Sequence, residues 1–350
     1  MNATAAAHDA VDYDELHNPP PLPEPDSEPD TPDEPARVIG TIRPAAAIPG
    51  PSAAEPEPGA PLPITLADFL ARKLPPREVL LAPWLPAKGL AMIYAARGVG
   101  KTHVALAVAY AVACGGEALG WRAPISRRVL YIDGEMPAPA MQERLAMLVA
   151  TTGTEPPTPD HFRLLANDLS ENGLPDLSTE DGQALLAPAC EGSDLIVLDN
   201  LSTLCRTGRE NESESWNVVQ PWLLAQRRAG RSVLLIHHAG KGGDQRGTSK
   251  REDVLDSVLR LDRPDDYEAS EGARFNVTFT KTRGFTGDAA NPLEARFADG
   301  RWTTRPLADA LAQRIYALAD EGMSQREIAT EIGKGVGTVN RHLKRREAAQ

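Results

Sequence analysis

The stretch AARGVGKT, residues 95–102, lies between two apolar runs and constrains the fold more than any other part of the sequence. Gly98 and Gly100 allow a tight curl of the backbone, in which consecutive N–H groups face inward at the start of a helix. In such a loop Lys101 reaches the β- and γ-phosphates of a nucleotide, and Thr102 places its hydroxyl on Mg²⁺. Because the loop needs a strand before it and a helix after it, it predicts an α/β domain.

The usual pattern of this loop opens with glycine, whereas here Ala95 takes that place. The extra methyl group is tolerated as long as the backbone φ stays negative. We therefore predict that a nucleotide binds along the whole loop. Its residues are Ala95, Ala96, Arg97, Gly98, Val99, Gly100, Lys101 and Thr102.

Apolar runs alternate with helical patterns through the middle of the chain. The runs predicted to be buried strands are residues 89–95, 127–135, 194–200 and 231–239. The stretches predicted to be helices are residues 102–116, 137–153, 179–192 and 212–230. This alternation predicts a mostly parallel sheet with helices on both faces. After residue 251 the pattern changes to that of an antiparallel extension, so we expect the α/β domain to span residues 64–304.

Residues 1–63 differ in composition from the rest of the chain. The first 64 residues hold twelve of the acidic residues, two of the basic ones and 15 of the 31 prolines. Such a segment buries too little apolar surface to offset its chain entropy, which predicts a disordered acidic tail. It acts either as a solubilising arm or as a docking segment for a partner. The tail carries most of the net charge of −12, so the charge does not exclude DNA binding by the remainder.

The three cysteines are Cys114, Cys190 and Cys205, and they lie far apart in the sequence. No Cys-x-x-Cys pair and no cluster with the spacing of zinc ligands is present, so neither disulfides nor zinc are expected. The chain also has no signal-peptide pattern and no apolar run of about 18 residues. We therefore expect a cytoplasmic protein without a membrane partner.

Acidic residues follow two of the predicted strands. Asp199 ends the run DLIVLDN, where an α/β sheet binds ligands, and is a candidate ligand of Mg²⁺; the alternative is a helix cap. Asp133 and Glu135 end the run VLYIDGE, and either is a candidate to position or activate the attacking water. Their spacing does not choose between them, and solvated loop acids are the alternative.

Two histidines end the strand predicted for residues 231–239. His238 lies nearer the tip and is a candidate sensor of the γ-phosphate; the alternative is one core histidine beside an exposed one. The glycine-rich stretch that follows contains Lys241, Arg246, Lys250 and Arg251. It contacts either DNA phosphates or a neighbouring subunit's nucleotide, or it is simply a solvated loop.

The order of these motifs resembles that of the RecA-like ATPases. The pieces are AARGVGKT, YIDGEMP, LIVLDNLSTLCRTGRENES, LLIHHAGK and QRGTSKREDVLDSVLRL. Over residues 75–300 the chain looks most like the RepA-type hexameric replicative helicases of plasmids and their relatives on prophages and integrative elements. The resemblance implies a RecA-like sheet, a ring of six subunits and one ATP at each subunit boundary.

The resemblance also implies roles for single residues. Lys101 and Thr102 would bind phosphate and Mg²⁺, Asp199 would be the second acid on Mg²⁺, and Glu135 rather than Asp133 would be the catalytic acid. His238 would link the γ-phosphate to the loops of the channel.

In the same family an arginine finger reaches the ATP of the next subunit. Arg246 matches it, with Lys241 as a possible helper. The channel loops that hold single-stranded DNA map onto residues 203–213 and 239–250, where Lys241 and Lys250 are candidate DNA contacts.

The C-terminal residues 305–350 resemble a small all-α helix-turn-helix domain of the resolvase or regulator type. Residues 324–332 would form its second helix, opened by a capping box of Ser324 and Glu327. Residues 336–346 would form the recognition helix on duplex DNA, with Val336, Val339 and Leu343 on its inner face. The candidate base contacts are Thr338, Asn340 and Arg341, and the candidate phosphate contacts are Lys344, Arg345 and Arg346. A helical bundle that packs on a partner is the alternative.

Three functions are compatible with these features. The first is an ATP-driven DNA motor, a helicase or helicase-like ATPase of a mobile element. The second is a DNA-bound regulator that ATP switches, and the third is a RecA-like recombination or repair ATPase. The complete hydrolytic set of Lys101, Glu135, Asp199 and Arg246 favours the motor.

Overall fold

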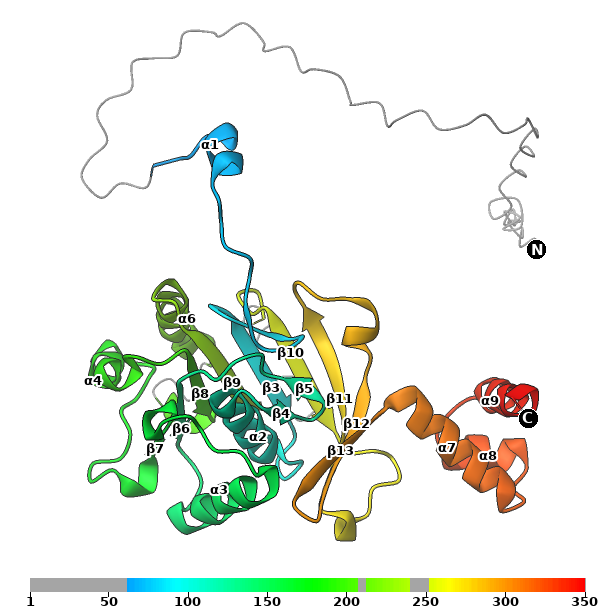
Figure 1. Ribbon diagram of the computed structural model, residues 1–350. Helices are drawn as coiled ribbons and strands as arrows, with labels where there is room; N and C mark the ends of the chain where they lie inside the picture. Colours follow the sequence, from blue (N-terminus) through cyan, green and yellow to red (C-terminus); the bar gives the residue numbers. More distant parts are fainter. Residues whose placement is uncertain (1–61, 207–211, 240–251, 350) are drawn as a thin grey trace, which may run out of the picture. The chain divides into compact units, whose positions relative to one another are not determined.

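The structure is a computed structural model that describes residues 62–206, 212–239 and 252–349 (Figure 1). The chain divides into two units, residues 1–72 and 73–350. In the first unit the structure describes one short helix, α1 (Leu66–Ala71), whose N-cap Thr65 accepts a hydrogen bond from the backbone of Asp68. The predicted tail lies almost entirely outside the described residues and stays a prediction.

A sheet of nine strands organises the described part of the second unit (Figure 1). In order across the sheet the strands are β13 (Arg301–Pro306), β12 (Leu293–Ala298), β11 (Ala273–Thr282), β10 (Ser257–Asp262), β3 (Leu90–Ala95), β9 (Ser232–His238), β8 (Leu195–Asp199), β6 (Val129–Asp133) and β7 (Phe162–Ala166). The six strands from β10 to β7 are parallel, and β11 to β13 extend the sheet antiparallel. This confirms the predicted mostly parallel sheet with an antiparallel extension.

Helices cover both faces of the parallel strands, and each face has its own apolar cluster. On one face lie α2 (Lys101–Cys114) and α3 (Ala138–Thr152), and on the other α4 (Glu180–Cys190), α5 (Leu201–Leu204) and α6 (Glu212–Arg228). Alternate residues of a strand go to different clusters, as the two-residue period of a strand requires. Ile93 and Tyr131 join the α2 side, whereas Met92 and Leu130 join the other.

Several small elements were not predicted. They are the hairpin of β1 (Val79–Leu81) and β2 (Leu85–Pro86), the hairpin of β4 (Glu117–Ala118) and β5 (Trp121–Arg122), the edge strand β7, and 3₁₀ turns at Pro159–His161, Asn167–Leu169, Ala269–Glu271 and Gly287–Ala290. Four of the five residues of β7 are only half-buried, because the strand has a neighbour on one side alone. Its sequence FRLLA therefore lacks the continuous apolar run of the inner strands.

Three helices follow the sheet: α7 (Leu307–Asp320), α8 (Gln325–Glu331) and α9 (Val336–Ala349). They enclose a third apolar cluster that includes Ile315, Ile328 and Val339. The predicted capping box is present, since the Ser324 hydroxyl accepts from the Glu327 backbone and the Glu327 carboxylate from the Ser324 backbone. The prediction for Val336 was wrong: it is 43% exposed, because the inner face of α9 begins one turn later.

Candidate functional site

The loop between β3 and α2 has the curl that its sequence predicts. Gly98 and Gly100 have positive φ angles of 76° and 124°, values that favour glycine. Ala95 keeps a negative φ, which is the condition under which alanine is accepted at this position. A side chain at Gly100 would also crowd the ring of Phe275, whose Cε1 atom lies 3.2 Å from the position of a Cβ. The loop therefore presents its backbone N–H groups at the start of α2.

Lys101 is buried within this loop, with 7% of its surface exposed. Its Nζ donates hydrogen bonds to the carbonyl oxygens of Ala95 at 3.1 Å and Ala96 at 2.9 Å. Burial lowers the pKa of Lys101, while the negative charges of Asp199 and Glu135 act in the opposite direction. The two carboxylates thus favour the charged ammonium form of Lys101, whereas its burial disfavours that form.

Asp199 ends β8 beside the loop and is 3% exposed. Its Oδ2 accepts a hydrogen bond from the Tyr131 hydroxyl at 2.7 Å, and the Thr102 hydroxyl acts with it to lower the pKa of Asp199. Burial raises the pKa of Asp199, against the effects of these two hydroxyls and of Lys101. The Thr102 hydroxyl and the Asp199 carboxylate provide oxygen ligands, which Mg²⁺ prefers. Mg²⁺ usually binds one or two protein oxygens and takes its other ligands from phosphate and water.

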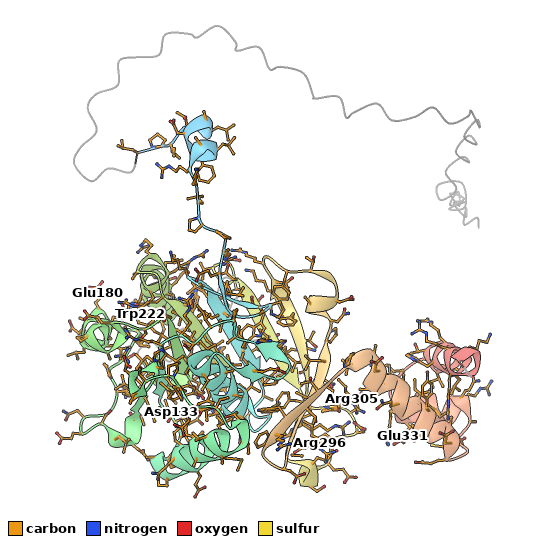
Figure 2. The ribbon with its side chains drawn as sticks, viewed as in Figure 1. Asp133, Glu180, Trp222, Arg296, Arg305 and Glu331 are labelled. Carbon is orange, nitrogen blue, oxygen red and sulfur yellow. The ribbon has the colours of Figure 1, made fainter. Side chains whose placement is uncertain are left out.

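The structure separates the two acids that follow β6. Asp133, labelled in Figure 2, is 1% exposed and accepts a hydrogen bond from the backbone of Met136 at 2.9 Å. It pairs in register with Asp199, and burial together with that neighbouring charge raises the pKa of Asp133 to about 7. Glu135 has a side chain that is 58% exposed, and its Oε2 lies 3.7 Å from Nε2 of His238. Asp133 therefore binds the backbone of the turn that follows β6, whereas the side chain of Glu135 extends from this turn toward His238.

Both histidines of β9 are buried, with exposures of 3% for His237 and 7% for His238. The alternative of an exposed histidine beside a core histidine is therefore wrong. Strand β9 lies between β3 and β8, so the end of the strand places His238 between the phosphate loop and Asp199. The contact with Glu135 brings His238 into the same group of side chains.

Three residues of this site were missed by sequence reasoning. The first is Tyr131, described above. The second is Asn200, whose side-chain amide donates to Glu135 Oε2 and whose carbonyl oxygen Oδ1 caps α5. The third is Arg263, which donates to the Gly98 carbonyl oxygen at 2.7 Å and lies over the ring of Tyr267. Only Tyr131 had a usable signal, because it lies two residues before Asp133 on the same strand face.

The candidate arginine finger and channel contacts lie outside the described residues. They are Lys241, Arg246 and Lys250, together with Arg251 and the segments 207–211 and 240–250 of the two predicted channel loops. Their roles stay predictions. Within the described ranges no cluster of three or more metal-ligating side chains is present, and the three cysteines form no disulfide. The same ranges contain no helix with the length and apolar character needed to cross a membrane.

The candidate DNA contacts on α9 differ in their availability. Arg341, Lys344 and Arg345 are exposed, whereas Thr338 and Asn340 are half-buried. Arg346, also a candidate phosphate contact, is half-buried, and its guanidinium makes two hydrogen bonds of 2.9 Å to the Asp320 carboxylate.

Two family models match separate parts of the chain. A family model described as an AAA domain matches residues 55–244, which is more than half of the chain. A second model, described as a helix-turn-helix domain, matches residues 305–346. Among solved structures the chain is similar to a KaiC-like protein from the hyperthermophilic archaeon Pyrococcus horikoshii. The two are 13% identical, the match covers 65% of this chain and 94% of that chain, and the TM-score is 0.45.

Proposed function

We propose that this chain, which belongs to the AAA domain family, is an ATP-hydrolysing motor that acts on DNA. One observation carries the proposal: Lys101, Thr102, Asp199 and Glu135 come together from three segments at the carboxyl end of the parallel strands. This edge is where open α/β sheets bind their ligands. A phosphate-binding lysine, a hydroxyl–carboxylate pair and an exposed acid are what phosphoryl transfer to water requires.

Each residue then has a defined task. The Lys101 ammonium exchanges loop carbonyls for phosphate oxygens, and Thr102 with Asp199 would hold Mg²⁺. When bound, Mg²⁺ neutralises the charge that develops on the phosphates. Glu135 orients the attacking water and accepts its proton. His238 contacts Glu135, so it is placed to relate the state of the γ-phosphate to β9 and to the loop that follows.

The finer proposal is a RepA-type ring helicase or helicase-like ATPase of a mobile element. The order of the motifs along the chain supports it. In this proposal Arg246, with Lys241, completes the site of the next of six subunits, so hydrolysis depends on assembly. Lys241 and Lys250 would also line a channel that holds single-stranded DNA by its phosphates.

The C-terminal helices would direct the motor to a specific site on duplex DNA. The match to a helix-turn-helix domain supports this role, as do the exposed cations of α9. We propose that Thr338, Asn340 and Arg341 face base edges and that Lys344 and Arg345 bind phosphates.

ATP hydrolysis by the purified protein, with and without single-stranded DNA, tests the motor. We expect strong stimulation by single strands. Lys101→Ala should lower turnover by at least about a hundredfold through lost phosphate contact. Glu135→Gln should lower turnover to a similar degree while ATP still binds. These two variants separate a failure to bind from a failure to hydrolyse.

The helix-turn-helix match also favours a second function, a DNA-bound regulator that ATP switches. Slow turnover that ignores single strands, with ATP still bound, would support the regulator and contradict the motor. Binding to a specific duplex should then change with the nucleotide, which a footprint with ATP and with ADP measures.

A further inference from the structure

Tyr131 lies in the middle of β6 and is the first residue of the piece YIDGEMP, in which only the acids Asp133 and Glu135 were assigned candidate roles. Its surface is completely buried, and its side chain joins the apolar cluster on the α2 face of the sheet. Asp133 follows two residues later on the same strand. The phenol therefore lies directly beneath the group of charged side chains at the end of the sheet.

The register of the sheet explains which group Tyr131 meets. Tyr131 lies opposite Val197 on β8, and Asp133 lies opposite Asp199. Asp199 is thus the diagonal neighbour of Tyr131, at a spacing that a long aromatic side chain can bridge. The hydroxyl spans this diagonal and donates to Oδ2 of Asp199 over 2.7 Å.

The ring of Tyr131 is held from the other side by Phe162. The two rings are stacked, with centroids 6.3 Å apart and planes inclined by 20°. A buried ring that is packed on a second ring keeps its rotamer, because repacking would open a cavity. The hydroxyl therefore has a fixed position, and Asp199 has to orient its carboxylate toward it.

This hydrogen bond leaves Oδ1 as the oxygen of Asp199 that Tyr131 does not engage. Groups behind a metal ligand commonly fix its orientation in this way and influence the affinity for the metal. A phenol suits the task, since it donates without bringing a positive charge that would compete with a cation.

We propose that Tyr131 is a positioning residue, whose hydroxyl holds Asp199 in the orientation that receives the Mg²⁺ of a bound nucleotide. The inference rests on the proposed function, because it concerns the same site. It adds that the higher affinity for a magnesium-bound nucleotide than for a free nucleotide depends on a residue that contacts neither the nucleotide nor the metal.

Tyr131→Phe tests the proposal, because it removes one oxygen and keeps the stacked ring. The probe is a fluorescent ADP analogue, titrated in Mg²⁺ and in EDTA. We expect the affinity in EDTA to stay within about twofold of the parent. The gain in affinity that Mg²⁺ gives should fall by about tenfold to a hundredfold, the usual worth of a hydrogen bond to a charged group. The midpoint of a Mg²⁺ titration at fixed ADP should rise accordingly.

Tyr110→Phe is the matched control. Tyr110 is also buried, and its hydroxyl donates to the Thr154 carbonyl oxygen at 2.7 Å, in a segment apart from the nucleotide site. This variant should match the parent in Mg²⁺ dependence while losing a tyrosine hydroxyl that makes a hydrogen bond of the same length. The shift in thermal midpoint caused by Mg²⁺-ADP, relative to ADP with EDTA, measures the same quantity in a less stable variant.

Three results would overturn the inference. A Tyr131→Phe protein with the Mg²⁺ dependence of the parent shows that the hydroxyl does not orient Asp199, and the proposed function then stands. Equal losses of affinity in Mg²⁺ and in EDTA show a general effect on the loop. A parent protein that binds ADP under neither condition removes the proposed function and this inference together.

Discussion

Asp133, Asp199 and Glu135 carry the same functional group but meet different surroundings. Asp133 and Asp199 are buried as a register pair, whereas the side chain of Glu135 is more than half exposed. A buried acid beside a second acid keeps its proton more readily, and the pKa of Asp133 accordingly rises to about 7. Burial therefore distinguishes the two acids that are enclosed in the site from Glu135, which solvent can reach.

His103, directly after Thr102, predicts a dependence of stability on pH. Burial and the charge of Arg144 lower the pKa of His103 to about 4. Between pH 6.5 and 4 the unfolded chain thus binds more protons at this residue than the folded chain, so stability falls as the pH falls. We expect His103→Gln to abolish this decrease in the free energy of unfolding, which amounts to at most about 1.4 kcal/mol per pH unit.

The measurement is urea denaturation of both proteins at pH 7 and pH 5. The stability of His103→Gln relative to the parent should rise toward pH 5. A difference that stays constant with pH would contradict the prediction.

Gly134 predicts a second effect of a single residue. A Cβ at this position would lie 2.5 Å from Oγ1 of Thr203 and 3.0 Å from Cδ2 of Leu204. Gly134→Ala should push the turn away from α5 and displace Glu135, lowering ATP turnover by tenfold or more. Binding of ADP should change little, because the phosphate loop is a separate segment. Gly116→Ala is the control, since its nearest neighbour is 3.9 Å away, and equal turnover in both variants would refute the argument.

Some residues of the site were predictable from sequence and others were not. The spacing of the phosphate loop defines Lys101 and Thr102, because that mechanism is local. The spacing of Asp133 and Glu135 could not choose between them, since it does not show where the strand ends and the turn begins. Arg263 and Gly98 lie 165 residues apart, and no local pattern relates them.

At the scale of elements, the inner strands were predictable because both of their faces are buried, which produces continuous apolar runs. The edge strand β7 was not, since exposure at an edge removes that signal. The capping box and the apolar spacing predicted the C-terminal helices, whereas the helix-turn-helix was inferred from a resemblance. The error at Val336 arose because the first turn of α9 protrudes beyond the cluster that the rest of the helix covers.

Helix α9, the proposed recognition helix, contains two arginines whose surroundings differ. Arg341 is exposed, whereas Arg346 is bound to Asp320 and lies 5.0 Å from the centre of the Tyr316 ring. Arg341→Ala should weaken binding to a cognate duplex by about tenfold and leave thermal stability unchanged. Arg346→Ala should lower the thermal midpoint slightly, more at low salt than at high salt, with a smaller effect on DNA. Fluorescence anisotropy with labelled duplex and thermal melts at two salt concentrations measure both. A larger DNA defect in Arg346→Ala would reverse the assignment.

At the scale of the whole molecule, the described residues form three apolar clusters, two against the sheet and one among α7, α8 and α9. The first two share the strands of the sheet and should unfold together. The third is built from residues of three consecutive helices, so its stability is set largely by its own contacts.

This separation predicts that one cluster can be weakened alone. Ile328 is completely buried in the third cluster, and Ile328→Ala should cost about 2–5 kcal/mol there. Calorimetry should show an earlier transition for the C-terminal helices and an unchanged main transition, with ADP affinity equal to the parent. Val336→Ala, at a 43% exposed position, should cost less than about 0.5 kcal/mol. A main transition that shifts as far as the first would show that the clusters unfold as one.

The pairing of β3 has a consequence for the order of events during synthesis. Leu90 pairs with Val233 on one side, and Ala91 pairs with Ser257 on the other. Both strands that flank β3 are therefore synthesised long after β3 itself. In contrast, β6 with β7 and the hairpins of β11 to β13 find their partners nearby. Distant pairings close late, because long loops must first be brought together. During translation the phosphate loop therefore emerges before the two strands that flank β3 have been made. A nucleotide can stabilise the folded domain only after β10 has been synthesised.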